Sequence, residues 1–559
     1  MHKQHPILKH TLLVLAILLF SGCGIRKSVD NRPDVSRFNN NIPEREKIND
    51  STFVMAQNFL TKNKQGIWEL YVAGDPLEIG LISGKLTQEL IYKQEAVFFE
   101  RIQDLVPSKG KQKFLSKFLS WYNRKMYKHM PEEYKTEIYG ISRYMSKDYN
   151  ALAKPYLRAL YLHGAHDIGH ALNDLALVGC TSFAVWDEKT EDGQLLVGRN
   201  FDFYAGDKFA ANKIISFINP DHGHKFMSYG WSGFIGVVSG MNDQGLTVTI
   251  NAGKSKIPLV AKTPISIVAR EILQYASNIE EAIAIAEKRA VFVSEAIMIS
   301  SAADRKAVLI EVSPKHMGVF EIGNSDVLVC ANHFQSDMFK NDRRNKKTIK
   351  NSHSQYRYDR MAQLLSENDK LNPEKAVAIL RNTQGINDKA IGFGNEKALN
   401  QLLAHHGIVF QPEELKVWVS ANPYQLGEFV GYDLNTVFEN KTIPNTSFTV
   451  SSPELNIEKD PFLKTEAYRN YEAYRILEAK ISKSIQEKKR IEDVELQKLT
   501  TLNPNYWEAD YLRGSYYYQQ KRYIEALRFF QNASAKEITT LPEVKNVEKY
   551  IKKSKRKIK

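Results

Sequence analysis

The chain has 559 residues, and its 77 Lys and Arg against 64 Asp and Glu give a formal net charge of +13. At roughly 150 residues per domain, this length predicts several structural units rather than one core. Hydrophobic residues make up 43% and charged residues 25% of the chain. This globular composition excludes a fibrous repeat, a largely disordered chain and a multi-pass membrane protein. With 3 Cys in the sequence, no disulfide framework is expected.

The first 22 residues are typical of an export signal. Lys3 and Lys9 come before or beside an apolar run at residues 11–20, which is too short for a membrane span of ~20 residues and fits a secretory hydrophobic region. The run ends in Phe20-Ser21-Gly22-Cys23, which resembles a bacterial lipobox. This resemblance implies a lipid anchor on Cys23, attached to a membrane without spanning it. A plain signal peptide cleaved elsewhere is the alternative, and both interpretations take the protein out of the cytoplasm.

Residues 23–179 are expected to form a tether followed by helices. Residues 23–50 are polar and rich in Asn, Arg, Asp and Pro, a composition that cannot bury a core. From residue 67 onward apolar residues recur at helical spacing, which predicts helices near residues 79–102, 113–127 and 131–145. Residues 51–179 are therefore predicted to be a helical segment.

From Cys180 the pattern changes to short strands separated by polar turns. Strands are predicted at residues 181–186, 195–199, 213–218, 233–238, 246–250, 296–300, 307–312, 327–330 and 415–420. Two helices are predicted at residues 264–277 and 279–290. Consecutive strands joined by short turns pair antiparallel, so residues 180–440 are predicted to form an α+β domain.

Residues 461–559 are helical and charged. The apolar and small residues of 507–533 resemble a tetratricopeptide (TPR) helix pair. One such unit is too short for a free solenoid, so it is expected to pack on the main domain and to offer a surface to a protein partner. The basic tail at 552–559 is expected to be solvated. Contact with anionic lipid headgroups, at roughly 1 kcal/mol per basic residue, is the alternative if an anchor already holds the chain at a membrane.

Two consecutive predicted strands carry the residues that point to chemistry. Cys180 opens the first strand, and Arg199 and Asp202 lie at the end of the second. In a hairpin this arrangement brings a cation and a carboxylate beside the thiol. A thiol attacks as the thiolate, and a nearby cation favours that form. The hairpin therefore indicates a cysteine nucleophile, with a buried structural cysteine as the alternative.

The order of the motifs resembles the N-terminal-nucleophile (Ntn) cysteine hydrolases. These include the bile salt hydrolases, the acid ceramidases and the penicillin acyl-CoA acyltransferases of peptidase family C45. The resemblance covers about residues 67–435 and rests on seven segments, which are residues 69–76, Cys180-Thr181-Ser182, residues 198–203, residues 240–246 with Asn251, residues 330–334, residues 356–360 and residues 415–420. It implies an αββα four-layer sandwich that needs no cofactor and no metal.

The resemblance also implies a self-processing mechanism. The chain would cut its own Gly179–Cys180 peptide bond, where Gly179 tolerates the backbone strain that an N→S acyl shift requires. The freed α-amine of Cys180, with a pKa of about 7.7–8.0, would act as the base for its own thiol. Cys180 would then hold the acyl group of a substrate as a thioester.

Family roles extend to five further residues. Asn251 resembles the side-chain donor of the oxyanion hole, and Asn332 resembles a second active-site Asn. Asp202 resembles the carboxylate that orients the amine. Arg199 and Arg357 resemble the cations around the nucleophile, and Arg360 competes with Arg357 for this role. For the two Asn residues, a turn or a strand-end cap is the alternative.

Three other features are expected to be outside the chemistry. Cys330 lies in an apolar stretch and is expected in the core, and a disulfide with Cys180 is not expected because it would abolish activity. His163, His166 and His170 would share a helix face and imidazole binds zinc, yet the neighbouring glycines argue against a rigid helix, so packing and hydrogen bonding are favoured over metal. The basic residues are scattered and form no nucleic-acid-binding motif. No Gly-rich phosphate loop precedes a helix, so nucleotide binding is not indicated.

The sequence therefore predicts an enzyme of the bacterial cell envelope that acts on N-acyl small molecules at their C–N amide bond. Hydrolysis and acyl transfer share the thioester and differ in whether water or an amine resolves it. Hydrolysis is favoured because an exported enzyme rarely meets acyl-CoA. The alternative is a non-catalytic envelope lipoprotein that displays its C-terminal helices to a partner.

Overall fold

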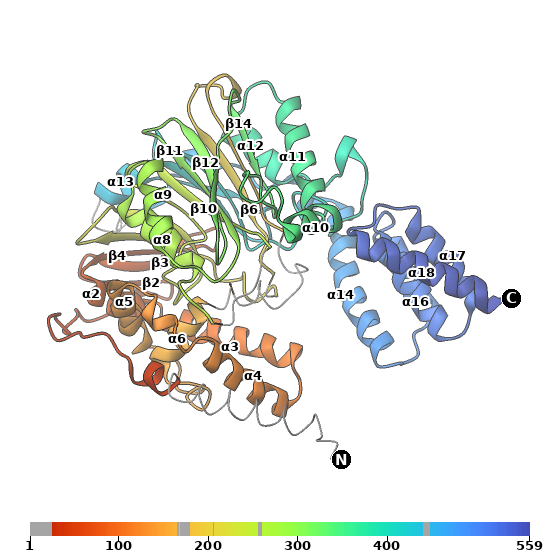
Figure 1. The fold of residues 1–559 in the computed structure, drawn as a ribbon, viewed down its shortest axis with the longest axis horizontal. Helices are drawn as coiled ribbons and strands as arrows, with labels where there is room; N and C mark the ends of the chain where they lie inside the picture. Colours follow the sequence, from red (N-terminus) through yellow and green to blue (C-terminus); the bar gives the residue numbers. More distant parts are fainter. Residues whose placement is uncertain are drawn as a thin grey trace, which may run out of the picture.

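Two β-sheets form the centre of the molecule (Figure 1). The computed structural model describes residues 25–164, 167, 179–204, 206–254, 260–439 and 448–558. Within these ranges the larger sheet has eleven strands in the order β1-β2-β3-β4-β7-β8-β9-β10-β11-β12-β13, and the smaller sheet has six in the order β14-β5-β6-β15-β16-β17. Neighbouring strands in the described ranges pair antiparallel except β4 and β7, which are parallel.

The strands of both sheets lie between residues 46 and 433, with long helical segments between some of them. The larger sheet contains β1 (Glu46–Asn49), β2 (Thr52–Met55), β3 (Asn58–Lys62), β4 (Trp68–Gly74), β7 (Ile214–Pro220), β8 (Phe226–Gly230), β9 (Ser239–Asn242), β10 (Leu246–Ala252), β11 (Glu295–Ser301), β12 (Lys306–Val312) and β13 (Met317–Phe320). The smaller sheet contains β5 (Thr181–Val185), β6 (Leu196–Phe201), β14 (Val327–Cys330), β15 (His406–Gln411), β16 (Lys416–Ser420) and β17 (Phe429–Asp433).

The helices lie before, between and after the strands. The N-terminal group is α2 (Pro76–Leu86), α3 (Gln88–Leu105), α4 (Lys109–Tyr122), α5 (Glu132–Ser142) and α6 (Pro155–His163). The central group is α8 (Ile265–Tyr275), α9 (Ile279–Lys288), α10 (Arg343–Asn351), α11 (Ser354–Glu367), α12 (Pro373–Leu380) and α13 (Leu434–Glu439). The C-terminal group is α14 (Glu466–Gln486), α15 (Asp493–Leu502), α16 (Trp507–Gln519), α17 (Tyr523–Ser534) and α18 (Leu541–Ile558).

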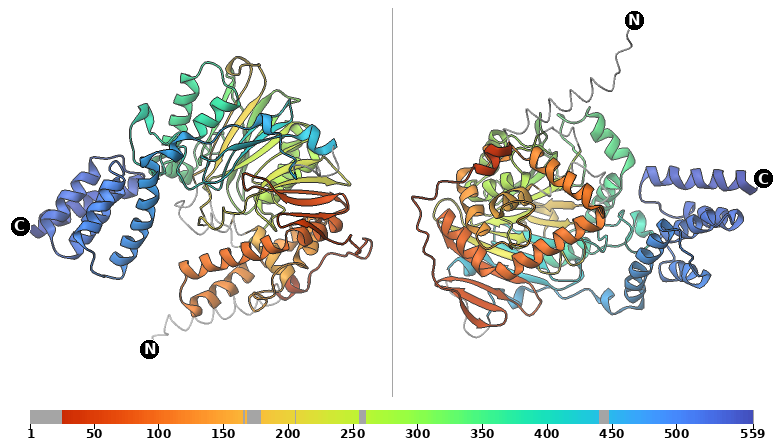
Figure 2. Two further views of the ribbon diagram at one scale, coloured as in Figure 1. Left: turned by 180° about the vertical axis from the view of Figure 1, so that it is seen from behind. Right: turned by 90° about the horizontal axis from the view of Figure 1, so that it is seen from below.

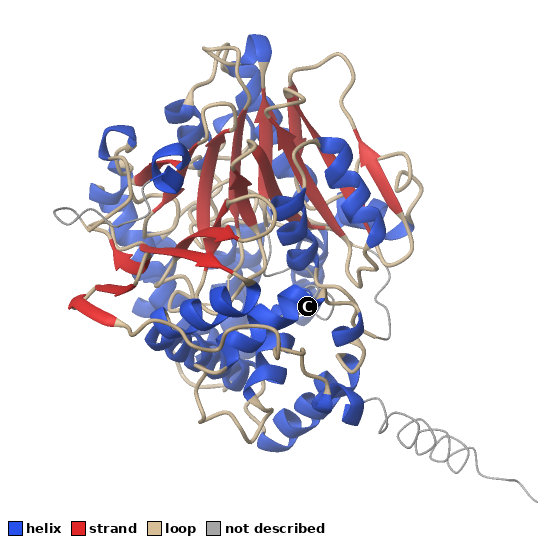
Figure 3. Cartoon of the chain, turned by 90° about the vertical axis from the view of Figure 1, so that its left-hand side faces the viewer, coloured by secondary structure: helices blue, strands red, loops and turns tan. Residues whose placement is uncertain are grey.

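The two sheets stack face to face between helices. On the outer face of the larger sheet, α2 packs on β4, α8 on β10 and α9 on β11 and β12, while α12 packs on β6 and β15 of the smaller sheet. Side chains alternate accordingly along β7, where Ile214 and Ile218 join the core under the helices and Ile215 and Phe217 join the core between the sheets. This period of two is the signature of a strand buried on both faces. Figure 3 shows the upright strands with helices below and beside them.

The predicted helical segment 51–179 and the predicted tether 23–50 are corrected in part. Strands β2, β3 and β4 occupy the start of the segment predicted to be helical, and β1 lies within the predicted tether. In β4, the five residues from Glu69 to Ala73 are all buried, and a short apolar run buried on both faces cannot be told from a helix by periodicity. The helix predicted at 79–102 is two helices, α2 and α3, which meet at Thr87.

The strand predicted at residues 233–238 is also wrong. These residues connect β8 to β9, and Gly233 has a φ of +76°. Their backbone groups bond elsewhere, since the Ile235 amide donates to His163 Nε2 at 3.0 Å and the Val237 amide donates to the Ser266 carbonyl at 2.8 Å. A backbone committed to these partners cannot form a ladder.

The C-terminal helices form a unit at one side of the sandwich (Figures 1 and 2). Helices α16 and α17 pack closely, and Gly514 allows this because a Cβ there would lie 2.8 Å from the Phe530 ring. Leu402, Tyr424 and Leu426 of the main domain join the core of these helices. The predicted packing on the main domain is therefore confirmed, whereas the TPR resemblance stays a prediction. Within the described ranges, no helix has the length and apolar character needed to cross a bilayer.

Candidate active site

The hairpin of β5 and β6 brings the predicted nucleophile and its neighbours together. Cys180 stands directly before β5 and Asp202 directly after β6, and the two strands pair with Ser182 opposite Arg199. The open end of the hairpin therefore gathers Cys180, Arg199 and Asp202, all of them buried. Arg199 Nη2 lies 3.8 Å from Cys180 Sγ. The Gly179 amide donates to the Asp202 carbonyl at 3.3 Å, so the predicted scissile bond lies at this end.

Arg357 reaches the same place from α11. Its Nη1 donates to the Cys180 carbonyl at 2.7 Å and also to Thr181 Oγ1, and its Nη2 donates to Asn332 Oδ1 at 2.6 Å. Asn332 follows β14 and donates through Nδ2 to the Ala252 carbonyl at 3.0 Å. One buried guanidinium thus ties α11 to the nucleophile and to the predicted second Asn.

Asn251, near the end of β10, completes the set of predicted residues. Its Oδ1 accepts a hydrogen bond from Ser182 Oγ at 3.0 Å, and its Nδ2 donates to the Cys330 carbonyl at 3.3 Å and to the Ala331 carbonyl at 3.5 Å. The acceptor contact turns the amide nitrogen away from Ser182, and the 3.3 Å bond is a long one. A substrate oxyanion would therefore replace one of two long hydrogen bonds of this amide nitrogen.

Arg360, the alternative to Arg357, lies in a different environment. It donates to Asn382 Oδ1 at 3.3 Å, Gln363 Oε1 at 3.1 Å and Asp388 Oδ1 at 2.5 Å. Of the two arginines, Arg357 is the one that contacts the Cys180 region. Cys330 is buried, and both cysteines in the described residues are free.

Burial dominates the electrostatics of the uncleaved chain. It raises the pKa of the Cys180 thiol to about 11, with Arg199 opposing and Asp202 reinforcing the shift. It also raises the pKa of the Asp202 carboxyl to about 7, against the opposing effects of Arg357 and Arg199. At neutral pH the Cys180 thiol is therefore protonated before cleavage, and its attack requires a base.

The raised pKa of Asp202 predicts a pH-dependent stability. Its folded-state pKa of about 7 lies above the ordinary 3.8, so the carboxyl stabilises the fold below about pH 4, and this contribution is lost as the pH rises through 7. In a Cys180→Ala background, which keeps the α-amine in its peptide bond, Asp202→Asn is expected to raise the Tm at pH 8 by roughly 2–5 °C and by less at pH 5. Differential scanning calorimetry at both pH values tests this, and an equal shift at both would contradict it.

A chain of buried hydrogen bonds behind Arg199 was not expected. Arg199 Nη1 donates to Ser239 Oγ, which lies 2.9 Å from His406 Nε2, and His406 Nδ1 lies 2.9 Å from His405 Nδ1. Burial holds the pKa of both histidines well below the usual value, which keeps them neutral. The two adjacent histidines at the start of β15 are the feature of the sequence that could have pointed to this hydrogen-bond chain.

Of the three histidines considered for metal binding, His163 lies in the described residues, whereas His166 and His170 lie outside them. His163 Nδ1 lies 2.8 Å from the Ala159 carbonyl, and its Nε2 accepts from the Ile235 amide at 3.0 Å. Both ring nitrogens are therefore engaged with backbone groups. Cys23 and the lipobox also lie outside the described residues.

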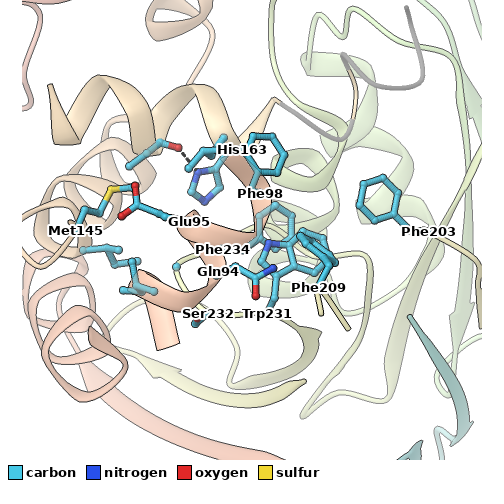
Figure 4. Close-up of a pocket in the computed structure, with 15 residues that line it drawn as sticks. Gln94, Glu95, Phe98, Met145, His163, Phe203, Phe209, Trp231, Ser232 and Phe234 are labelled. Carbon is cyan, nitrogen blue, oxygen red and sulfur yellow. Dashed lines mark hydrogen bonds between the residues drawn. The ribbon is translucent and has the colours of Figure 1, made fainter. Parts of the chain in front are cut away.

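A mainly apolar pocket opens between the N-terminal helices and the β8–β9 connection (Figure 4). It contains about 670 Å³ of empty space, including the part open to solvent. Its lining includes Phe98, Met145, Phe203, Trp231 and Phe234. Phe203 stacks on Phe201 with ring centroids 5.8 Å apart, and the Arg199 guanidinium lies 4.3 Å from the Phe201 centroid. A series of rings thus connects the pocket wall to the surroundings of Cys180.

Comparisons with known proteins concern the central part of the chain. Residues 188–423 match the family model described as acyl-coenzyme A:6-aminopenicillanic acid acyl-transferase. An uncharacterized protein of Archaeoglobus fulgidus is 26% identical over 242 residues, which are 39% of this chain and 38% of that protein. The chain therefore spans well under two thirds of the length of the curated relative that it matches.

Two solved structures match part of this chain at low TM-scores. The Caenorhabditis elegans ortholog of N-acylethanolamine-hydrolyzing acid amidase has a TM-score of 0.31 and 18% identity, covering 42% of this chain and 93% of that one. A mutant of the conjugated bile acid hydrolase from Clostridium perfringens has a TM-score of 0.31 and 17% identity, covering 46% of this chain and 92% of that one.

The segment that matches the family model contains the side chains that gather around Cys180. Arg199, Asp202, Asn251, Asn332 and Arg357 all lie between residues 188 and 423. The family model is named for an acyl-transferase, and Cys180 itself lies before the first matched residue. The central part of this chain is thus similar to the acyl-coenzyme A:6-aminopenicillanic acid acyl-transferase family.

Proposed function

We propose that this chain is a self-processing enzyme of the Ntn cysteine type that cleaves N-acyl amides through a thioester. The observation that carries the proposal is the meeting of Arg199, Asp202 and Arg357 with Cys180 at the open end of one hairpin. Cleavage of the Gly179–Cys180 bond would leave Cys180 with a free α-amine. An amine with a pKa near 8 is a suitable base for its own thiol at neutral pH.

The roles of the surrounding residues follow from their contacts. The released amine would lie near Asp202, because the Gly179 amide already bonds to the Asp202 carbonyl. The Arg199 cation, 3.8 Å from the sulfur, would favour the thiolate. Asn251, with its weakly engaged amide, would donate to the oxyanion of a substrate carbonyl. The thioester at Cys180 would then be resolved by water.

The apolar pocket supports an acyl group as the retained half of the substrate. Its wall is made of aromatic and aliphatic side chains, and burial of an apolar chain there contributes roughly 0.8 kcal/mol per methylene. Glu95, the acidic residue of the lining, is already paired with Arg158 at 2.7 Å. Such a site suits an apolar acyl chain better than a charged one.

Intact mass spectrometry and denaturing gels on the purified full-length protein test the proposal. We expect two fragments, the second beginning at Cys180, and a carboxylic acid as the product from an N-acyl amide. A lipid on Cys23, which we propose as the envelope anchor, would add its mass to the first fragment. An added primary amine separates the two reactions, since acyl transfer to it would identify a transferase. A wild-type chain that stays uncut would contradict self-processing.

A further inference from the structure

The carbonyl group of the predicted scissile bond has a side-chain donor. Gln401 Nε2 donates to the Gly179 carbonyl oxygen at 3.0 Å. Gln401 is 1% exposed, and Gly179 is buried as well. A buried amide that bonds to one particular carbonyl in a water-poor site stabilises charge on that oxygen more strongly than it would in water.

Gln401 and Gly179 also match sterically. A Cβ on residue 179 would lie 2.1 Å from Gln401 Nε2 and 2.6 Å from its Oε1. Because the obstacle is the end of a flexible side chain, a larger residue at 179 would push the amide away and leave the backbone in place. A glycine before Cys180 is therefore what allows the amide to reach the carbonyl.

The loop that carries Gln401 is held on both sides. Asn400 Oδ1 accepts from the Leu402 amide at 3.0 Å, and the Asn400 amide donates to the Asn382 carbonyl at 2.9 Å. The Leu402 carbonyl accepts from Tyr471 Oη of α14 at 3.2 Å. The donor is thus positioned before any reaction, partly by the C-terminal helices, as electrostatic catalysis requires.

We propose that Gln401 is a catalytic residue of the self-cleavage step, where its amide stabilises the oxyanion that forms on Gly179. This inference rests on the proposed function. It adds a donor for the chain's own peptide bond, whereas Asn251 was assigned to the substrate carbonyl. It also gives the C-terminal helices a structural part in processing.

The step is balanced without any co-reactant other than water. Cys180 Sγ bonds to the Gly179 carbonyl carbon, and the carbonyl electron pair moves to the oxygen held by Gln401. The C–N bond then breaks, and the proton lost from the thiol ends on the departing nitrogen, which becomes the α-amine of Cys180. Water cleaves the resulting thioester, which leaves a carboxylate on Gly179 and a thiol on Cys180.

The isosteric variant Gln401→Glu tests the role of the donor. It keeps the side-chain volume but replaces the N–H donor with a carboxylate oxygen. We expect self-cleavage of the full-length chain to slow by roughly 10²–10³-fold, the usual effect of losing one oxyanion donor. The rate is measured by quantifying the two fragments over time on denaturing gels after synthesis. Gly179→Ala is expected to slow cleavage as well, because its methyl group displaces the amide.

Gln274→Glu is the matched control. Gln274 is also buried and its Nε2 also donates to a backbone carbonyl, that of His222, at 3.0 Å. We expect this variant to cleave at the wild-type rate, with Tm measured for each protein. If Gln401→Glu cleaves as fast as wild type, or if both glutamine variants slow equally, the role of Gln401 is overturned while self-processing stands. An uncut wild-type chain would instead overturn both proposals.

Discussion

Replacing Cys180 with alanine is expected to abolish both self-cleavage and turnover. The thiol is the nucleophile of both reactions in the proposed mechanism, and removing a nucleophile costs roughly 10⁶-fold in rate in well-studied cases. Gels and intact mass spectrometry of this variant should show one uncut chain, in which residue 179 is still bonded to residue 180. Incubation with N-acyl amides should give no acyl-enzyme mass and no carboxylic acid above background.

Cys330→Ala is the matched control for this experiment. Cys330 is also buried and free, and its thiol donates to the Ala331 carbonyl at 3.5 Å. This substitution also removes a buried sulfur atom, here from the core between the sheets, so it shows how the loss of a buried sulfur affects the fold. We expect it to leave cleavage intact. A Cys180→Ala chain that still splits at residue 179 would exclude the thiol as the attacking group.

Arg357→Lys is expected to have the second largest effect. Lysine keeps the positive charge but loses the planar fork that bonds the Cys180 carbonyl, Thr181 and Asn332 together. Losing two charge-assisted hydrogen bonds at about 2 kcal/mol each corresponds to roughly 10³-fold in rate. The measurement is the rate of fragment formation, followed by kcat/KM on an N-acyl amide for the fraction that is cleaved.

Arg360→Lys serves as its control. Arg360 is equally buried and lies one turn along α11, but its partners are Asn382, Gln363 and Asp388. We expect it to lower Tm without slowing self-cleavage more than a few-fold. Equal losses of cleavage in the two variants would mean that α11 supports the fold rather than the reacting groups.

The local hairpin explains why part of the site was predictable. Cys180, Arg199 and Asp202 lie on two consecutive strands, so a correct expectation of two strands and a turn was enough to bring them together. Strands β10, β11, β12 and β14 were predictable for a similar reason, since their apolar runs are short and are separated by clear turns. Strand β13 (Met317–Phe320) was missed. The α+β class followed from the order of these elements.

Contacts between distant segments were harder to foresee. The first strands of the larger sheet were missed because β4 is buried on both faces and shows no alternation. Arg357 and Arg360 are three residues apart on one helix, and helical spacing alone does not say which of them faces Cys180. Gln401 lies 222 positions after Gly179, in a loop without any motif.

The sequence by itself therefore determined the class of the fold, the hairpin and the cysteine with its neighbouring Arg199 and Asp202, because these depend on residues close together in the chain. The tertiary structure alone decided which arginine of α11 meets the cysteine, which amide holds the Gly179 carbonyl, and how β4 joins β7 in one sheet. Those contacts depend on how helices and loops pack against the sheets, and packing is a property of the whole fold rather than of any short stretch.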